Sequence, residues 1–200
     1  MVRYLSVLLA ALTIQPGYAA DFYSAKDGAT VHQTFLPAGV YVSIGGGEVF
    51  SATSISTLAL AGQGLAADAR IGYDWRVPNT KFIVGPWAGI GIADVTGKNL
   101  SGREKWDWSA GLRAGRVFNT SDLLYGVVGY KQIHEGIVAT PLNPALDGLV
   151  VGGGIEFDIA NGVTLGTEID YTWIGNYTPV AGVTFKSSEF DAKARVGFRL

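Results

Sequence analysis

The sequence predicts an all-β fold, an eight-stranded antiparallel transmembrane β-barrel with short periplasmic turns and longer extracellular loops. Three observations support this prediction. Apolar and polar residues alternate strictly in several segments, the chain contains 28 glycines and many aromatic residues, and the connections between the segments alternate in length. Period-two alternation indicates strands because successive side chains point to opposite faces. An even strand number with short turns at one end is typical of membrane barrels.

The first twenty residues have the layout of a secretory signal peptide. Arg3 gives a positive start, an apolar run covers 4–14, and small residues end the segment at Ala19 or Ala20. The apolar run is too short to cross a bilayer as a helix. We therefore expect 1–20 to be cleaved, 21–38 to form a periplasmic N-terminal segment, and 39–200 to form the barrel.

Five segments alternate clearly. In the last one, every even-numbered residue from Phe190 to Leu200 is apolar, and every odd-numbered residue from Glu189 to Arg199 is charged or glycine. The other four have largely apolar rows, and Arg116 interrupts the second of them near a strand end, where it could snorkel to the interface. The rows are Leu65, Ala67, Ala69, Ile71, Tyr73, Trp75 and Val77; Trp106, Trp108, Ala110, Leu112, Ala114 and Phe118; Leu149, Val151, Gly153, Ile155, Phe157 and Ile159; Val163, Leu165, Thr167, Ile169, Tyr171 and Trp173.

Three more strands are expected at 39–46, 81–94 and 123–135, with their facing left open. In the last, placing Lys131 and Glu135 inward leaves the following residues outward: Leu124, Val128 and Tyr130. The short connections are 78–80, 119–122 and Asn161-Gly162, an Asn-Gly pair being a strong hairpin signal. The longer ones are expected near 47–63, 95–104, 136–147 and 175–188.

The residue types on the two faces of the strands indicate whether lipid or water surrounds the barrel. The face opposite the apolar rows carries these charged residues: Asp68, Arg70, Asp74, Arg76, Lys105, Asp107, Arg113, Lys131, Glu135, Glu156, Asp158, Glu168, Asp170, Glu189, Asp191, Lys193, Arg195 and Arg199. Unpaired charges in a dry core cost several kcal/mol per ion. Trp and Tyr at both ends of the strands match the aromatic belts of a bilayer protein. A membrane barrel is therefore favoured over a soluble periplasmic barrel.

The charged face then lies inside the barrel, where acids and bases nearly balance. An eight-stranded barrel is only just wide enough for side chains to fill. We expect a network of ion pairs in place of an open pore, with inward glycines making room for long side chains. A narrow passive channel remains an alternative.

The sequence offers little catalytic chemistry. The chain has no cysteine and a net charge of −2, which excludes thiolate sites and argues against nucleic-acid binding. No catalytic, cofactor-binding or metal-binding residue is predicted. His134, near the outer end of a strand, is the one candidate for a lipid-modifying rim site, and His32 lies in the N-terminal segment. His134-Glu135 is a poor metal pair because adjacent strand residues point to opposite faces.

The chain resembles the small outer-membrane proteins of the OmpA-like β-barrel superfamily, especially the opacity-like surface antigens of alphaproteobacteria. The resemblance rests on the signal-peptide end Gly-Tyr-Ala-Ala-Asp-Phe (17–22) and the segments 40–47, 124–130 and 194–200. Such proteins usually end in phenylalanine, which the barrel-assembly machinery reads, whereas this chain ends in Leu200. The resemblance implies a non-enzymatic, monomeric envelope protein that contacts outer-membrane lipid and lipopolysaccharide, and whose loops at 48–62 and 176–188 meet host or envelope ligands.

Overall fold

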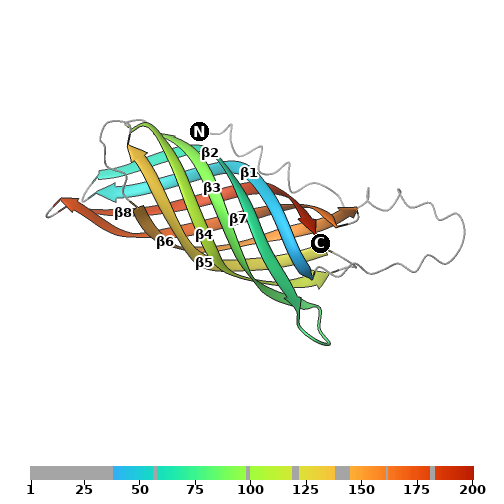
Figure 1. The fold of residues 1–200 in the computed structure, drawn as a ribbon. Helices are drawn as coiled ribbons and strands as arrows, with labels where there is room; N and C mark the ends of the chain where they lie inside the picture. The colour runs from blue at the N-terminus through green and yellow to red at the C-terminus, as the bar shows by residue number, and fades with distance from the viewer. Residues whose placement is uncertain are drawn as a thin grey trace, which may run out of the picture. The chain divides into compact units, whose positions relative to one another are not determined.

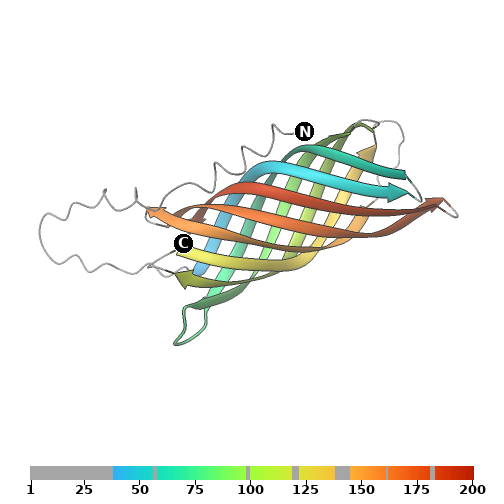
Figure 2. The same cartoon turned by 180° about the vertical axis from the view of Figure 1, so that it is seen from behind.

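The computed structural model describes residues 38–55, 58–97, 100–118, 122–137, 145–160, 162–180 and 183–200. They form eight strands: β1 (Gly39–Ile55), β2 (Leu58–Arg76), β3 (Phe82–Gly97), β4 (Leu100–Phe118), β5 (Asp122–Ile137), β6 (Ala145–Ala160), β7 (Val163–Val180) and β8 (Val183–Arg199). Each strand pairs with its sequence neighbours, and β8 pairs with β1, so that the sheet closes on itself (Figures 1 and 2). All pairs are antiparallel. The predicted fold class is confirmed.

The register of the strands sets the tilt and the width of the barrel. Followed from Val42 through each neighbouring strand in turn, the pairing returns to β1 at Ala52, ten positions further along the chain. This stagger across eight strands corresponds to a tilt of about 40° and a backbone radius of about 8 Å. An interior of this width is filled by side chains.

The β2–β3 turn and the strand ends joined by the two other short connections lie at the barrel end that also holds the C-terminus (Figure 1). In the β2–β3 turn, Asn79 has a φ of 59°, and Thr80 Oγ1 donates to Val77 O at 2.9 Å and accepts from Phe82 N at 3.1 Å. Gly162 has a φ of 85°, as the expected Asn-Gly hairpin requires. We call this end of the barrel the turn end and the opposite end the far end.

The prediction of long loops at the far end is wrong in its boundaries. β1 continues to Ile55 and β2 begins at Leu58, and the pairing of these two strands runs without a break from Gly39 to Ile55. The segment 176–188 likewise belongs largely to β7 and β8. Ser, Thr, Ala and Gly in these segments obscure the alternation, but backbone pairing to an already formed strand extends the ladder regardless of the side chains.

The predicted facing of the five clearly alternating strands is confirmed, except at Arg76. Large apolar side chains of the alternating rows lie exposed on the outside, among them Leu65, Ile71, Leu112, Leu149 and Ile169. Lys131 is buried inside, and Leu124, Val128 and Tyr130 are exposed outside. The two other undecided strands also present their odd-numbered residues inward, since the side chains of Tyr41 on β1 and Trp87 on β3 are buried.

The expected signal peptide (1–20), nearly all of the expected periplasmic segment (21–38) and His32 lie outside the described residues. In the part of the chain that is described, no helix is long and apolar enough to cross a membrane.

Candidate functional site

Among the described residues, the charged side chains inside the barrel form two groups. The first, which we call the arginine cluster, lies toward the turn end. Arg113 and Arg199 come from β4 and β8 and share Asp74 and Glu156. Arg113 lies 2.7 Å from Glu156 and 3.9 Å from Asp74, and Arg199 lies 2.7 Å and 2.9 Å from the same two carboxylates. Two bases therefore neutralise two acids in a buried site.

Glu168 on β7 is the most heavily bonded carboxylate of the arginine cluster. Arg70 donates to its two oxygens at 2.7 and 2.9 Å, a bidentate arrangement. Arg195 donates to it at 3.0 Å, and the Tyr125 hydroxyl donates at 2.9 Å. Arg195 also bonds Asp68. Since Arg70, Glu168 and Tyr125 come from β2, β7 and β5, these bonds join strands that are not neighbours in the sheet.

Aromatic rings support the arginine cluster. The guanidinium carbon of Arg113 lies 3.9 Å from the ring centroid of Tyr125 and 4.7 Å from that of Tyr41. Arg70 lies 4.2 Å from the ring centroid of Trp87. Guanidinium groups stack favourably on aromatic faces. These inward rings were not predicted from the sequence, because aromatic residues were expected to face lipid.

The second group, the lysine cluster, lies toward the far end. Lys131 on β5 lies 2.7 Å from Glu189, 3.4 Å from Asp191 and 3.7 Å from Asp107. Lys193 lies 3.4 Å from Asp191. Two lysines here face three carboxylates, whereas the arginine cluster has about one base per acid. The lysine cluster is therefore richer in acid than the arginine cluster.

Glycines make room for these side chains, as the sequence predicted. A Cβ added at Gly152 would lie 1.9 Å from Asp170 Oδ1, and one added at Gly45 would lie 2.4 Å from Asp68 Oδ1. Both carboxylates come from the neighbouring strand and lie in register with the glycine. Each of these inward glycines thus leaves the space that a charged neighbour fills.

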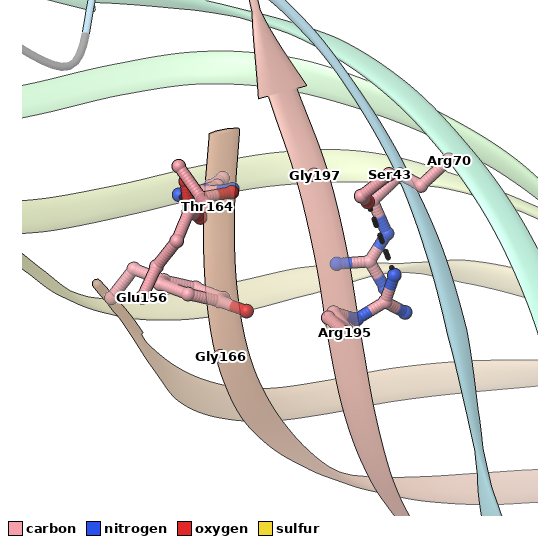
Figure 3. A pocket seen from close by; sticks show the side chains of 9 residues that line it. Ser43, Arg70, Glu156, Thr164, Gly166, Arg195 and Gly197 are labelled. Atoms are coloured by element: carbon pink, nitrogen blue, oxygen red, sulfur yellow. Dashed lines mark hydrogen bonds and ion pairs between the residues drawn. The ribbon is translucent and has the colours of Figure 1, made fainter. Parts of the chain in front are cut away.

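Apolar side chains cover the charged layers at both ends of the interior. Ile133, Leu146 and Ile174 form a buried cluster toward the far end. The turn end is covered by another apolar group, which includes these residues: Ile83, Val117 and Leu123. A cavity within the arginine cluster is about the size of one water molecule. Figure 3 shows it between Arg70, Arg195 and Ser43 on one side and Glu156 and Thr164 on the other.

Most of the predicted charged face lies in this interior, with two qualifications. Arg76 is exposed at the turn end, where its Nε donates to Thr80 O at 3.4 Å, so its inward placement was wrong. Arg76 follows the buried Asp74 by two residues along β2 and lies beyond the apolar side chains that cover the turn end. The side chains of Lys105 and Glu135 lie outside the described part of the chain.

His134 does not join the charged interior. Its ring stacks on the outward Trp106, with centroids 3.8 Å apart and planes 4° from parallel. Among the described residues, no serine or carboxylate bonds to His134, and no group of three or more His, Cys, Asp and Glu side chains could hold a metal ion. The geometry therefore provides no nucleophile–histidine–acid arrangement in the described structure.

The fold and its two faces define a class: a closed eight-stranded antiparallel barrel with an apolar exterior and an ionic interior. The chain is similar in structure to Neisserial surface protein A, with 16% sequence identity over 82% of this chain and 98% of that chain and a TM-score of 0.51. The outer membrane enzyme PagL has 10% identity, 80% and 99% coverage and a TM-score of 0.49. The outer membrane protein OprG from Pseudomonas aeruginosa has 12% identity over 82% of this chain and 97% of that chain, with a TM-score of 0.46.

No family model and no curated protein sequence matches this chain. At these low identities, the likeness to Neisserial surface protein A establishes the fold alone.

Proposed function

We propose that this chain is an exported outer-membrane barrel of a Gram-negative bacterium that acts as a non-enzymatic structural and surface protein. The observation that carries the proposal is the band of apolar side chains around the outside of a barrel whose inside is ionic. By the register and the strand tilt, Trp75 near the turn end and Trp106 near the far end lie roughly 25 Å apart along the barrel axis. Outer-membrane barrels have an apolar band of about this height.

The exposure of this band supports a lipid environment. Ile44, Leu65 and Ile90 are 66%, 71% and 66% exposed on adjoining strands. A contiguous apolar surface of this kind is unfavourable in water and favourable against hydrocarbon. Detergent extraction tests the placement: the protein should stay with the outer-membrane fraction and require detergent. A freely dissolved periplasmic monomer would overturn it.

The strands extend beyond the apolar band at the far end. Strands of 16 to 19 residues at this tilt span about 40–48 Å along the axis, well over the height of the band. We infer that this paired extension projects from the cell and offers its surface to host or envelope ligands. It takes the place of the long loops expected at 48–62 and 176–188.

The absence of cysteine in the chain gives a clean test of this orientation. Ser54→Cys lies on the far extension and Val77→Cys lies at the turn end, and both side chains are exposed. A membrane-impermeant maleimide should label Ser54→Cys on intact cells and Val77→Cys only after the outer membrane is opened. The reverse pattern would show that the far end faces the periplasm.

Because side chains fill the interior of the barrel, we expect that the protein does not conduct solutes. Purified protein in a planar bilayer should give no steady conductance steps, and regular steps would favour the narrow channel instead. The position of His134, stacked on Trp106, supports a non-enzymatic role. Loss of acyl chains from lipid A in the presence of the protein, abolished by His134→Ala, would establish the lipid-modifying alternative.

Export and assembly belong to the same proposal. Residues 1–20 would direct secretion, and the barrel-assembly machinery would insert the mature chain as a monomer among outer-membrane lipids and lipopolysaccharide. N-terminal sequencing of the mature protein tests the first step, with cleavage expected after Ala19 or Ala20.

A further inference from the structure

A group of polar and aromatic side chains lies on the outer surface of β4, β5 and β6, and the function proposed above does not account for its polar members. It consists of Trp106, Trp108, Tyr130, Gln132, His134 and Asp147, and we call it the rim patch. All six lie on the outward face, where Trp106 pairs with His134, Trp108 with Gln132, and Gln132 with Asp147 in the strand register. The register places them at the far border of the apolar band, where lipid headgroups would lie.

The rim patch contains a hydrogen-bond network that holds its polar groups in place. Trp108 Nε1 donates to Gln132 Oε1 at 3.1 Å, and Gln132 Nε2 donates to Asp147 Oδ1 at 2.9 Å. The Tyr130 hydroxyl also bonds Asp147 Oδ1. Gln132 Nε2 also donates to the Tyr130 hydroxyl at 3.2 Å. The second carboxylate oxygen of Asp147 and the remaining lone pair of the tyrosine hydroxyl can accept hydrogen bonds from a ligand.

The stacked pair of Trp106 and His134 lies beside this network. Trp106 is 52% exposed, and its contact with His134 fixes the orientation of the indole. A rigid aromatic face next to fixed hydrogen-bonding groups suits a ligand that has both a hydrocarbon face and hydroxyl groups. A sugar ring has this combination.

The charge of the rim patch determines which lipid headgroups it can bind. It carries the Asp147 carboxylate and no lysine or arginine, whereas recognition of a phosphate relies on arginine or lysine. Apolar side chains continue from the patch toward the turn end, as Leu112, Val128 and Leu149 are all exposed. The patch therefore matches an amphiphile with an uncharged polar head and acyl chains.

We propose that the rim patch binds the uncharged sugar headgroup of a membrane glycolipid, with the apolar face of the sugar against the exposed rings of the patch and its hydroxyls on Asp147 and Tyr130. This inference rests on the membrane placement proposed above. The two can fail separately, because insertion into vesicles is measured independently of lipid preference.

The test uses the mature protein in nanodiscs that contain equal amounts of phosphatidylcholine, phosphatidylglycerol and monogalactosyl diacylglycerol. Native mass spectrometry of the released protein should show the galactolipid as the preferred adduct. Trp106→Ala and Asp147→Asn should each lower its retention by roughly fivefold, equivalent to about 1 kcal/mol. Trp75→Ala is the matched control, because Trp75 is 54% exposed at the opposite border, and it should retain the lipid.

Normal flotation of each variant with vesicles shows that it has folded and inserted. Equal retention by all variants, or a preference for phosphatidylglycerol, would overturn the proposal. Excess methyl galactoside tests the source of the sugar: full displacement of the lipid by this soluble sugar would overturn the assignment to a membrane glycolipid, and persistence of the adduct supports it.

Discussion

The two charged clusters inside the barrel both neutralise buried carboxylates, but they do so with different cations. The arginine cluster pairs each carboxylate with planar guanidinium groups, as in the two bonds from Arg70 to Glu168. The lysine cluster relies on ammonium groups at single points, with Lys131 shared among three carboxylates at 2.7 to 3.7 Å. Guanidinium groups bind carboxylates bidentately and stack on rings, while an ammonium group does neither as well.

This difference shows where the barrel is most tightly held. In the arginine cluster, Tyr41, Trp87 and Tyr125 pack beneath the charges, so ionic and apolar contacts reinforce each other. Beside the lysine cluster, Asp170 on β7 stands in register opposite Asp191, and like charges facing each other across two strands are destabilising. We therefore expect the turn half of the interior to contribute more to stability than the far half.

The largest expected effect comes from removing Glu168. Glu168→Ala leaves the buried Arg70 and Arg195 without this carboxylate, and breaking such a pair costs about 3–5 kcal/mol. The free energy of unfolding, measured by urea titration in detergent micelles, should fall by about this amount. Glu48→Ala is the control, because Glu48 is exposed on the outside, and it should change stability by less than about 1 kcal/mol. Equal losses in the two variants would contradict the role given to the cluster.

A somewhat smaller effect is expected from the lysine cluster. Lys131→Met keeps the length of the side chain but leaves Glu189, Asp191 and Asp107 without their shared cation. We expect a loss of about 3 kcal/mol in the same titration, since a buried pair is broken while Lys193 still faces Asp191.

Adding Asp191→Asn to Lys131→Met should recover part of the lost stability, because it removes one of the repelling charges. A double variant less stable than the single one would show that repulsion between the acids is not what Lys131 relieves.

The sequence predicts the lipid-facing side of the strands better than the inward side, because the two sides require different residue types. The outward rows could be read directly, because lipid-facing positions must be apolar at every second residue, as from Phe190 to Leu200. The strand at 81–94 could not be oriented, because Ile83 and Trp87 on its inner face are as apolar as Val84 and Ile90 on its outer face.

The sequence alone does not predict which charged side chains pair with one another inside the barrel. The charged residues were identified, but their partners depend on the stagger between strands, which brings Arg70 on β2 to Glu168 on β7. The far ends of the strands were missed for another reason. The segment 51–55 carries mostly small side chains without a clear alternation and is held by the backbone ladder, which side-chain periodicity does not report.

The smallest expected effect tests the comparison between the clusters most directly, by exchanging their chemistries. Arg113→Lys keeps the positive charge beside Glu156 but removes the planar group that stacks on Tyr125 and Tyr41. We expect a loss of about 1–2 kcal/mol from the weaker stacking and hydrogen bonding. Lys193→Arg makes the reverse exchange in the lysine cluster, where no ring contact depends on the ammonium group, and should change stability by less than about 0.5 kcal/mol. Both variants keep the net charge, so a difference between them in the urea titration reports the geometry of the cation alone. If both lost the same stability, the advantage of the arginine cluster would not come from its planar, ring-supported guanidinium groups.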